Sequence, residues 1–265
     1  ILLVDKAGGI TSHGVVARAR RLVGTRKIGH AGTLDPMATG LLVLGVNSST
    51  RLLTWVVGLD KQYEATIRLG ASSSTDDAEG ELSSPATRGA LDAVSDEAIA
   101  EAVRGLTGAI LQRPSAVSAI KVDGKRAYAR VREGEVVVLA ERQVTVSSFE
   151  VLGVDRGEFI DVRVIVDCSS GTYIRALARD LGSILGVGGH LTALRRTRIG
   201  PFSVTEAATL ETEGLAERML APADAAARLF PILDVTEAEA ADLTNGKRIS
   251  EEKNAYNPAL AEYKV

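Results

Sequence analysis

Apolar and polar residues alternate from Ile160 to Asp167 with one exception, the apolar Ile165, and this alternation constrains the fold more than any other feature of the sequence. Ile160, Val162, Val164 and Val166 fall on one face of an extended chain, because successive side chains of a strand point to opposite sides. The pattern therefore predicts a half-buried strand in a sheet that is covered on one face.

Helical and strand-like segments interleave in the rest of the chain. Apolar residues recur at helical spacing from Ile174 to Leu185 and after two capping serines, Ser12 and Ser95. Two further runs have the length and composition of strands, Leu41–Val46 and Tyr63–Leu69. Because the order lacks strict βαβ regularity, we expect an α+β fold with a mixed, mainly antiparallel sheet flanked by helices, plus a small C-terminal segment.

Composition narrows the cellular setting. With 45% apolar and 25% charged residues the chain is globular, and its single cysteine, Cys168, excludes an intrachain disulfide. No apolar run approaches the roughly 20 residues that span a bilayer, and no signal peptide is visible. We therefore expect a cytoplasmic protein, and because the sequence opens at Ile1 without a methionine we expect residues to be missing before it.

The net charge of −3 conceals an uneven distribution of charge. Residues 232–265 hold seven acids and four bases, so the first 231 residues are neutral. Two segments, Lys6–Leu34 and Leu181–Thr205, contain no acid and several arginines. The two segments either lie together and form one positive face that binds a polyanion such as a nucleic acid, or lie apart as two unrelated solvated surfaces. Composition alone leaves both interpretations open.

The glycine-rich segment Lys27–Gly40 places one carboxylate on a stiff loop. Asp35 precedes Pro36, which forces it into an extended conformation, and three glycines permit close backbone approach. The sequence therefore predicts a loop over Ile28–Gly40 that presents either a catalytic carboxylate or an Asp-Pro turn.

Other chemistry-bearing residues also have two interpretations. The three histidines are far apart in sequence, which argues against a metal site, and Cys168 at a strand end is typical of a small buried thiol. Arg175 lies at the start of a predicted helix, where its charge opposes the dipole and so indicates another partner. Tyr63 is either a stacking platform or a half-buried sheet residue.

Six segments follow one another in the order seen in a known family. They are KAGGITSHGVV (Lys6–Val16), KIGHAGTLDPMATG (Lys27–Gly40), KQYEATIRLG (Lys61–Gly70), SAIKVDGKRAY (Ser118–Tyr128), CSSGTYIRALARDLG (Cys168–Gly182) and HLTALRRTRIGPF (His190–Phe202). They resemble the motifs of the bacterial tRNA pseudouridine synthases of the TruB type, which modify uridine 55 in the T loop. The resemblance extends to about Phe230 and implies the pseudouridine-synthase catalytic fold.

The resemblance implies roles for individual residues. Asp35 matches the catalytic aspartate, Tyr63 the tyrosine that stacks on the target base, and Arg175 the arginine that pairs with the aspartate. The residues that match substrate-binding or pocket-supporting positions are His30, Lys6, Tyr173 and Leu194. The basic residues that we expect on the RNA backbone are Arg18, Arg20, Arg21, Lys27, Arg195, Arg196 and Arg198, which would give a log–log salt slope of about −5 to −7.

The resemblance also implies a domain division. We expect a catalytic domain over residues 1–230, with an RNA-gripping insertion at about 112–134, and a partial PUA-like segment over 231–265. Three features depart from the family pattern: Ala7 replaces a usual proline, Val117 replaces a common tyrosine, and the acidic tail carries no clear PUA signature.

The implied reaction needs no added group. Pseudouridine forms when uracil leaves ribose C1′ through N1 and returns through C5, so the stoichiometry requires no cofactor and no metal. The expected partner is the T-arm stem-loop of tRNA, with no membrane and no obligatory protein partner. Whether Asp35 attacks C1′ or C6 stays open, as do three alternatives: a tRNA-folding chaperone, a guide-RNA-dependent pseudouridylase and, more remotely, a hydrolase.

Overall fold

The computed structural model describes residues 1–115, 121–122, 125–126 and 139–248. The chain divides into two compact units, Ile1–Leu220 and Ala221–Val265. None of the helices in the described ranges is both long enough and apolar enough to cross a membrane.

The first unit is built on a nine-stranded sheet. Its strands are β1 (Leu2–Lys6), β2 (Ile28–Ala31), β3 (Thr39–Val46), β4 (Lys61–Leu69), β5 (Gly108–Gln112), β8 (Arg142–Arg156), β9 (Ile160–Cys168), β10 (Gly189–Ile199) and β11 (Phe202–Ser203). Its helices are α1 (Ser12–Val23), α2 (Leu53–Val57), α3 (Arg88–Asp92), α4 (Asp96–Gly105) and α6 (Ile174–Ile184), with short 3-10 turns at Asn47–Leu52, Val204–Glu206 and Leu215–Arg218.

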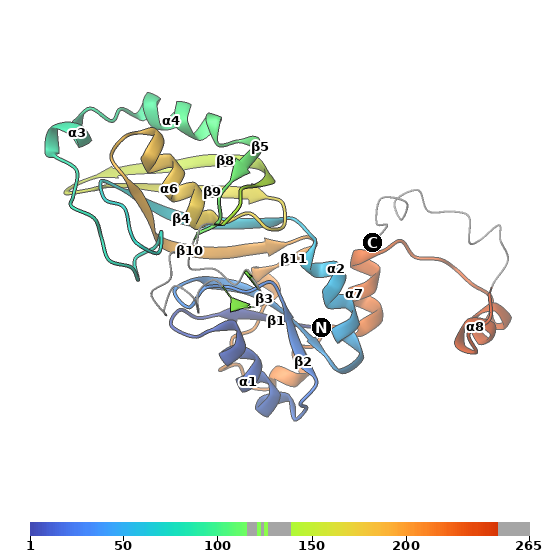
Figure 1. The fold of residues 1–265 in the computed structure, drawn as a ribbon. Helices are drawn as coiled ribbons and strands as arrows, with labels where there is room; N and C mark the ends of the chain where they lie inside the picture. The colour runs from blue at the N-terminus through green and yellow to red at the C-terminus, as the bar shows by residue number, and fades with distance from the viewer. Residues whose placement is uncertain (116–120, 123–124, 127–138, 249–265) are drawn as a thin grey trace. The chain divides into compact units, whose positions relative to one another are not determined.

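The strand order is β1-β3-β10-β4-β9-β8-β5, with β2 beside β3 and β11 beside β10 (Figure 1). β10 runs parallel to β3, whereas the other strand pairs of the described chain are antiparallel. The predicted α+β class with a mixed, mainly antiparallel sheet is therefore confirmed.

The larger part of the sheet carries helices α4 and α6 on one face (Figure 1). β9 runs from Ile160 to Cys168 with its alternate residues buried, as the sequence pattern predicts, and β4 alternates in the same way. α6 buries Ile174, Leu177 and Leu181 against this face, so one apolar core links helices and strands.

The N-terminal part holds a second apolar core between α1 and strands β1, β2 and β3. α1 begins after Thr11, whose hydroxyl accepts from the Gly14 N–H, so Thr11 and not the predicted Ser12 is the N-cap. The expectation of a loop throughout Ile28–Gly40 is wrong for Ile28–Ala31, which pairs with β3. Gly29 lies opposite Gly45, where a side chain would press on Leu53 and Thr50, so these glycines serve close packing within a strand.

The parallel pair β3·β10 is the junction on which the two parts of the sheet meet. Thr39 pairs with Arg195 and Gly40 with Arg196. Gly40 has a φ of 97°, and a Cβ there would overlap the backbone carbonyl of Arg196. The loop that carries Asp35 therefore ends where only glycine allows β10 to approach.

The remaining predicted segments are described in part. Val117 and most of the predicted insertion at 112–134 lie outside the described residues. The described part of this insertion includes two short strands, Lys121–Val122 (β6) and Lys125–Arg126 (β7), which pair antiparallel. The second unit contains α7 (Pro222–Leu229) and α8 (Glu237–Thr244). α8 begins after Thr236, which forms a capping box with Glu239.

A glycine in α6 yields a test of how closely this helix packs. Gly182 is a helical residue whose added Cβ would overlap the backbone of Gly188 and Gly189. We expect Gly182→Ala to destabilise the protein by about 1–3 kcal/mol, because backbone has to move, although alanine favours a helix. Urea unfolding measures the difference.

The matched control is Gly89→Ala in α3, where nothing lies within 4 Å of the added Cβ. There the better helix propensity of alanine is expected to raise the free energy of unfolding by about 0.5–1 kcal/mol. Equal effects at both positions would contradict the close approach of α6 to the turn that follows it.

Candidate active site

A cavity of about 290 Å³ brings together six of the residues that the sequence singles out. They are Asp35, Tyr63, Tyr173, Arg175, Leu194 and Arg196. They come from the β2–β3 loop, β4, the start of α6 and β10, so segments that are distant in the chain meet here. The combination of one acid with basic and aromatic groups in a hollow makes this the candidate active site.

The loop that carries Asp35 is fixed on both sides of that residue. Ser12 Oγ accepts from the Leu34 N–H at 2.9 Å and donates to the Leu34 carbonyl at 3.1 Å. The Pro36 carbonyl accepts from the Gly9 N–H at 2.8 Å and from Lys6 Nζ at 3.1 Å. The carboxylate is therefore presented on a backbone that has little freedom to move.

Arg175 binds Asp35 through two nitrogens. Nε lies 3.0 Å from Oδ2 and Nη2 donates to Oδ1 at 3.2 Å. The Arg175 side chain is 5% exposed, whereas that of Asp35 is 34% exposed and lines the cavity. The guanidinium thus covers the protein side of the carboxylate and leaves its other side open to a ligand.

A second carboxylate, Asp77, shares the same guanidinium. Arg175 Nη1 lies 3.3 Å from Asp77 Oδ2, and Nη1 also donates to the Thr75 carbonyl at 2.9 Å. Asp77 is 4% exposed and lies in the polar segment that links β4 to α3. This segment is attached to the core, because the Leu191 N–H donates to the Asp76 carbonyl at 3.0 Å.

The environment of Asp35 disfavours its charge. Burial raises the pKa of Asp35, the nearby Asp77 raises it further, and Arg175 and Lys6 oppose the rise. Lys6 is 1% exposed, and burial lowers its pKa to about 8 against the raising effect of Asp35. Arg175 is thus the principal group that favours the ionised form of Asp35.

Tyr63 is buried on the side of β4 that faces the cavity, and burial raises the pKa of its phenol. Lys61 is its neighbour on β4 and donates to the carbonyls of Val57 (2.8 Å) and Leu59, and burial lowers its pKa to about 8. Tyr63 therefore lies beside the cavity as a neutral aromatic group.

Tyr173 is held from two sides. The amide of Gln112 accepts from the Tyr173 N–H at 2.8 Å and donates to its carbonyl at 3.0 Å. The guanidinium of Arg142 lies over the Tyr173 ring, with its Cζ 4.7 Å from the centroid. Leu194 completes the apolar part of the wall from β10.

His30 and Lys6 do not line the cavity. Lys6 supports it through the Pro36 carbonyl, as the resemblance implies for a supporting residue. His30 is half-buried on β2 and makes an edge contact with His13, the ring centroids being 5.5 Å apart. Among the residues that the structure describes, no three His, Cys, Asp or Glu side chains are grouped as metal ligands.

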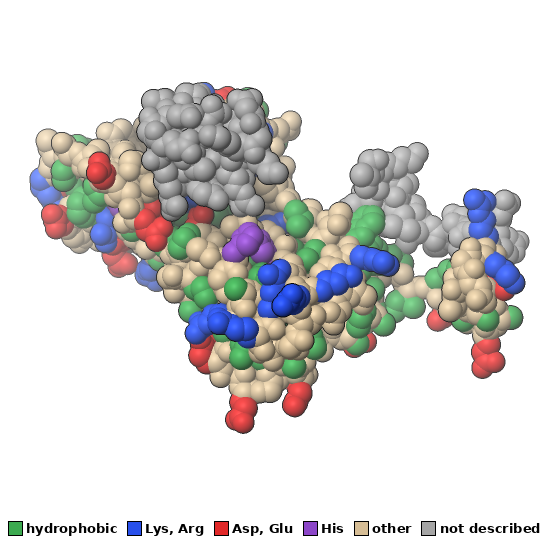
Figure 2. Space-filling model, turned by 60° about the horizontal axis from the view of Figure 1, so that its bottom comes forward, with side chains coloured by type: hydrophobic (Ala, Val, Ile, Leu, Met, Phe, Trp, Pro, Cys, Tyr) green, Lys and Arg blue, Asp and Glu red, His purple; other side chains and the backbone are tan. Residues whose placement is uncertain are grey.

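The seven predicted backbone-contact residues have different surroundings. Arg18, Arg20, Arg21 and Lys27 are exposed on and after α1, and Figure 2 shows lysine and arginine side chains gathered near histidine side chains on one face. Arg195 pairs with Asp5 at 2.7 Å and Arg198 with Asp167 at 2.5 Å, so both charges already have partners.

The assignment of Arg196 to the RNA backbone is wrong. Its side chain is buried, at 1% exposure for the residue, and donates to the carbonyls of Leu41 at 2.8 Å and Gly32 at 3.1 Å. A guanidinium in this position cannot reach a phosphate on the surface. It supports the cavity wall and the β3·β10 junction instead.

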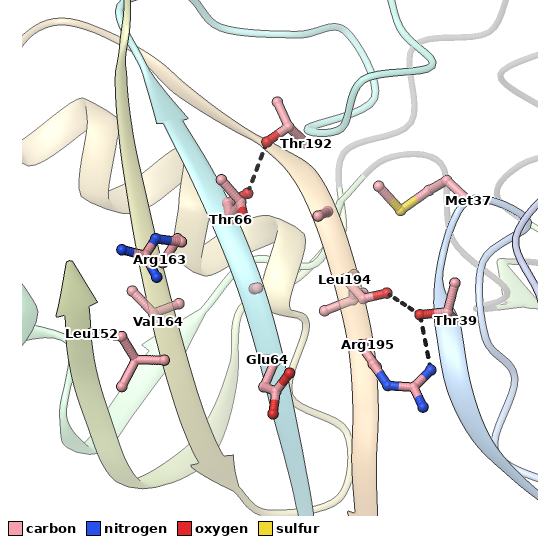
Figure 3. A pocket seen from close by; sticks show the side chains of 12 residues that line it. Met37, Thr39, Glu64, Thr66, Leu152, Arg163, Val164, Thr192, Leu194 and Arg195 are labelled. Carbon is pink, nitrogen blue, oxygen red and sulfur yellow. Dashed lines mark hydrogen bonds between the residues drawn. The ribbon is translucent and has the colours of Figure 1, made fainter. Parts of the chain in front are cut away.

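A larger hollow of about 470 Å³ shares Leu194 with the 290 Å³ cavity and is otherwise lined by different residues (Figure 3). Glu64 and Thr66 line it from the positions of β4 that alternate with Tyr63, and Arg195 and Thr192 line it from β10. Asp35, Arg175 and Tyr63 do not line this hollow, so the smaller cavity carries the chemistry.

Sequence reasoning missed Asp77, Gln112 and Ser12 as supports of the site. Each acts through a partner that is distant in the chain. Asp77 and Gln112 belong to no local pattern that marks them, and the pattern around Ser12 indicates a helix cap and not a contact with Leu34. The prediction that Cys168 is a small buried thiol is confirmed, because the cysteine is buried and burial raises its pKa to about 11.

Comparison with known proteins gives consistent results. The family model for the TruB family pseudouridylate synthase (N terminal domain) matches residues 20–174, and that for the tRNA pseudouridylate synthase B C-terminal domain matches residues 175–237. The tRNA pseudouridine synthase B of Leifsonia xyli subsp. xyli is 62% identical over 250 residues, which are 94% of this chain and 83% of that protein.

Two solved structures are similar in fold. An H/ACA ribonucleoprotein bound to a substrate RNA containing 2′-deoxyuridine has a TM-score of 0.69 and 26% identity, covering 94% of this chain and 67% of that one. A chain of the archaeal box H/ACA Nop10–Cbf5 complex has a TM-score of 0.58 and 29% identity. The match covers 82% of this chain but only 52% of the latter.

The charges around Asp35 predict opposite effects of two substitutions. Asp77→Asn removes a like charge and is expected to lower the pKa of Asp35, whereas Arg175→Gln removes the favourable cation and is expected to raise it further. Carboxyl-carbon NMR titration of the two variants measures both shifts.

Arg104→Gln on α4 serves as the control, because Arg104 is exposed and forms an ion pair with Glu101 of the same helix. This substitution is expected to leave the titration of Asp35 unchanged. A shift in the same direction in both site variants would show that the arrangement of charges around Asp35 is wrong.

Proposed function

The chain belongs to the TruB family of pseudouridylate synthases, and from this premise we propose that uridine 55 in the T loop of tRNA is the nucleotide it converts to pseudouridine. Its activity is that of a tRNA pseudouridine synthase, which is an isomerase. The observation that carries the proposal for the site is the Asp35–Arg175 pair at the wall of a cavity that Tyr63 also lines.

The proposed target has to leave its stack to reach this cavity. Extrusion of a nucleotide costs a few kcal/mol. Stacking of the uracil on Tyr63 returns about 1–3 kcal/mol, and contacts of exposed cations with phosphates offset the rest. His30, Leu194 and Tyr173 are proposed to contact the substrate around the extruded base, and Lys6 to support Asp35.

The proposed role of Asp35 requires a carboxylate that is ionised although partly desolvated. The two-nitrogen contact with Arg175 supplies this condition, because burial alone raises the pKa of Asp35. In this proposal Asp35 is the nucleophile, Arg175 maintains its charge and position, and Tyr63 orients the base. The cleaved and the reformed bonds both belong to the nucleotide, so the reaction consumes no second substrate.

The remaining assignments are part of the same proposal. We assign residues 1–230 to the catalytic domain, the insertion at 112–134 to gripping RNA, and 231–265 to a partial PUA-like segment. The T-arm stem-loop is the proposed recognition unit, without an obligatory protein partner. A tRNA substrate makes the cytoplasm the proposed compartment.

The alternatives have less support. A folding chaperone needs no buried Asp35–Arg175–Asp77 cluster in a cavity of nucleobase size. A guide-dependent pseudouridylase is disfavoured because the solved H/ACA chains are 26–29% identical, whereas the Leifsonia tRNA pseudouridine synthase B is 62% identical. Modification of an isolated T-arm hairpin by the chain alone distinguishes these functions.

Asp35→Asn tests the proposed nucleophile. The amide keeps the shape of the side chain but carries no negative charge, so we expect the rate of pseudouridine formation on a T-arm hairpin to fall by about 10⁴-fold or more. The Kd for the hairpin is expected to change less than about 3-fold. Single-turnover assays and filter binding measure the two quantities.

The control is Asp92→Asn, because Asp92 is an exposed carboxylate that forms an ion pair with Arg88 of α3. We expect this variant to retain the wild-type rate. A rate within ten-fold of wild type for Asp35→Asn would remove Asp35 from the chemistry.

The exposed cations predict the salt dependence of RNA binding. Arg196 is buried, and Arg195 and Arg198 are held in short, partly buried ion pairs. The exposed basic residues Arg18, Arg20, Arg21 and Lys27 remain for phosphates, because the ion pair of Arg18 with Glu211 is long, at 3.6 Å, and lies on the surface. We therefore expect the log–log slope of affinity against salt to be about −3 to −4, instead of the steeper slope that seven contacts would give.

Arg21→Gln is expected to reduce the magnitude of this slope by about one. Arg104→Gln on α4 is the matched control and is expected to leave the slope unchanged. A flat salt response of the wild-type protein would show that the surface around α1 does not bind RNA.

A further inference from the structure

Four cationic side chains line the candidate active site, and three of them are committed to partners within the protein. They are Lys61, Arg142, Arg175 and Arg196. Arg175 binds Asp35 and Asp77, Arg196 donates to two backbone carbonyls, and Lys61 donates to two more. Arg142 differs from these three because part of its guanidinium has no partner in the described part of the chain.

Arg142 carries a charge that has no carboxylate partner in the part of the chain that the structure describes. No carboxylate of the described residues lies within ion-pair distance of it. Its Nη2 donates to the Gly171 carbonyl, whereas its Nε is buried and has no hydrogen-bond partner among the described residues. A desolvated N–H donor with no partner costs free energy unless a ligand supplies the acceptor.

The position of the Arg142 guanidinium is fixed in advance. One of its faces lies over the ring of Tyr173 at 4.7 Å, and the Tyr173 backbone is held by both polar atoms of the Gln112 amide. Gln112 itself is fully buried at the end of β5. The stacked guanidinium therefore presents its remaining N–H groups at the cavity without loss of side-chain entropy on binding.

We propose that Arg142 binds a backbone phosphate of the extruded target nucleotide. A planar guanidinium suits phosphate oxygens, and an RNA nucleotide brings phosphates to the mouth of any cavity that takes its base. The uracil carbonyls are neutral and would leave the charge of Arg142 uncompensated. The proposal rests on the proposed function, and it adds an anion site that fixes the nucleotide while Asp35 reacts.

Neutral linkages in the RNA test this site directly. T-arm hairpins are prepared with the natural phosphodiester or with a methylphosphonate, either 5′ or 3′ to the target uridine. Binding is measured in the Asp35→Asn background, so that no product forms. We expect one of the two neutral linkages to weaken binding about 10- to 100-fold, because a charge-assisted hydrogen bond is lost.

Arg142→Gln in the same background is expected to bind the natural hairpin weakly. Its affinity should equal that of the Asp35→Asn protein for the hairpin whose neutral linkage weakens binding. It is also expected to show no further loss on the neutral hairpin. Arg142→Lys keeps the charge and is expected to retain most of the discrimination. Arg104→Gln, which changes an exposed arginine of α4, is expected to behave as the background protein.

Three results would overturn the proposal. The first is that Arg142→Gln binds the natural hairpin as tightly as the Asp35→Asn protein does. The second is that Arg142→Gln still loses as much affinity on the neutral hairpin as the Asp35→Asn protein does. The third is that neither neutral linkage weakens binding to the Asp35→Asn protein. The parent enzyme, with Asp35 intact, is assayed on the natural hairpin in parallel. Its failure to form pseudouridine there would instead refute the T-loop assignment, so the two failures are distinguishable.

Discussion

A buried guanidinium shared by two carboxylates is the interaction on which the rest of this structure depends. Arg175 lies between Asp35 and Asp77, and each acid without it would be a desolvated, unpaired charge. The surrounding contacts keep this triad in place: Ser12 holds the residue before Asp35, and the Thr75 carbonyl holds the guanidinium. Only Asp35 has an open side, so the cluster directs its one accessible carboxylate into the cavity.

The triad requires a backbone that brings distant segments together, and the β3·β10 junction supplies it. Parallel pairing sets Gly40 beside Arg196, so the loop before β3 ends against β10. The buried Arg196 side chain then bonds the Leu41 and Gly32 carbonyls, which lie on either side of that loop. An arginine that looks like part of an RNA-binding cluster thus stabilises the scaffold of the site.

The sequence predicts local features well and long-range partners poorly. Alternation and periodicity identified β9, β4 and α6, because those patterns record which face is buried. Asp35 and Arg175 were paired through resemblance, whereas Asp77 and Gln112 act across the fold and carry no local signal. Arg195 and Arg196 were grouped by charge, but neighbours on a strand point to opposite faces, so only one of them can meet the same ligand.

The connection between β3 and β10 has a consequence for synthesis. Arg195 and its strand partner Thr39 are separated by 156 positions, so their pairing closes a long loop and carries an entropic cost. A nascent chain on the ribosome has no complete catalytic pocket until β10 has emerged from the exit tunnel.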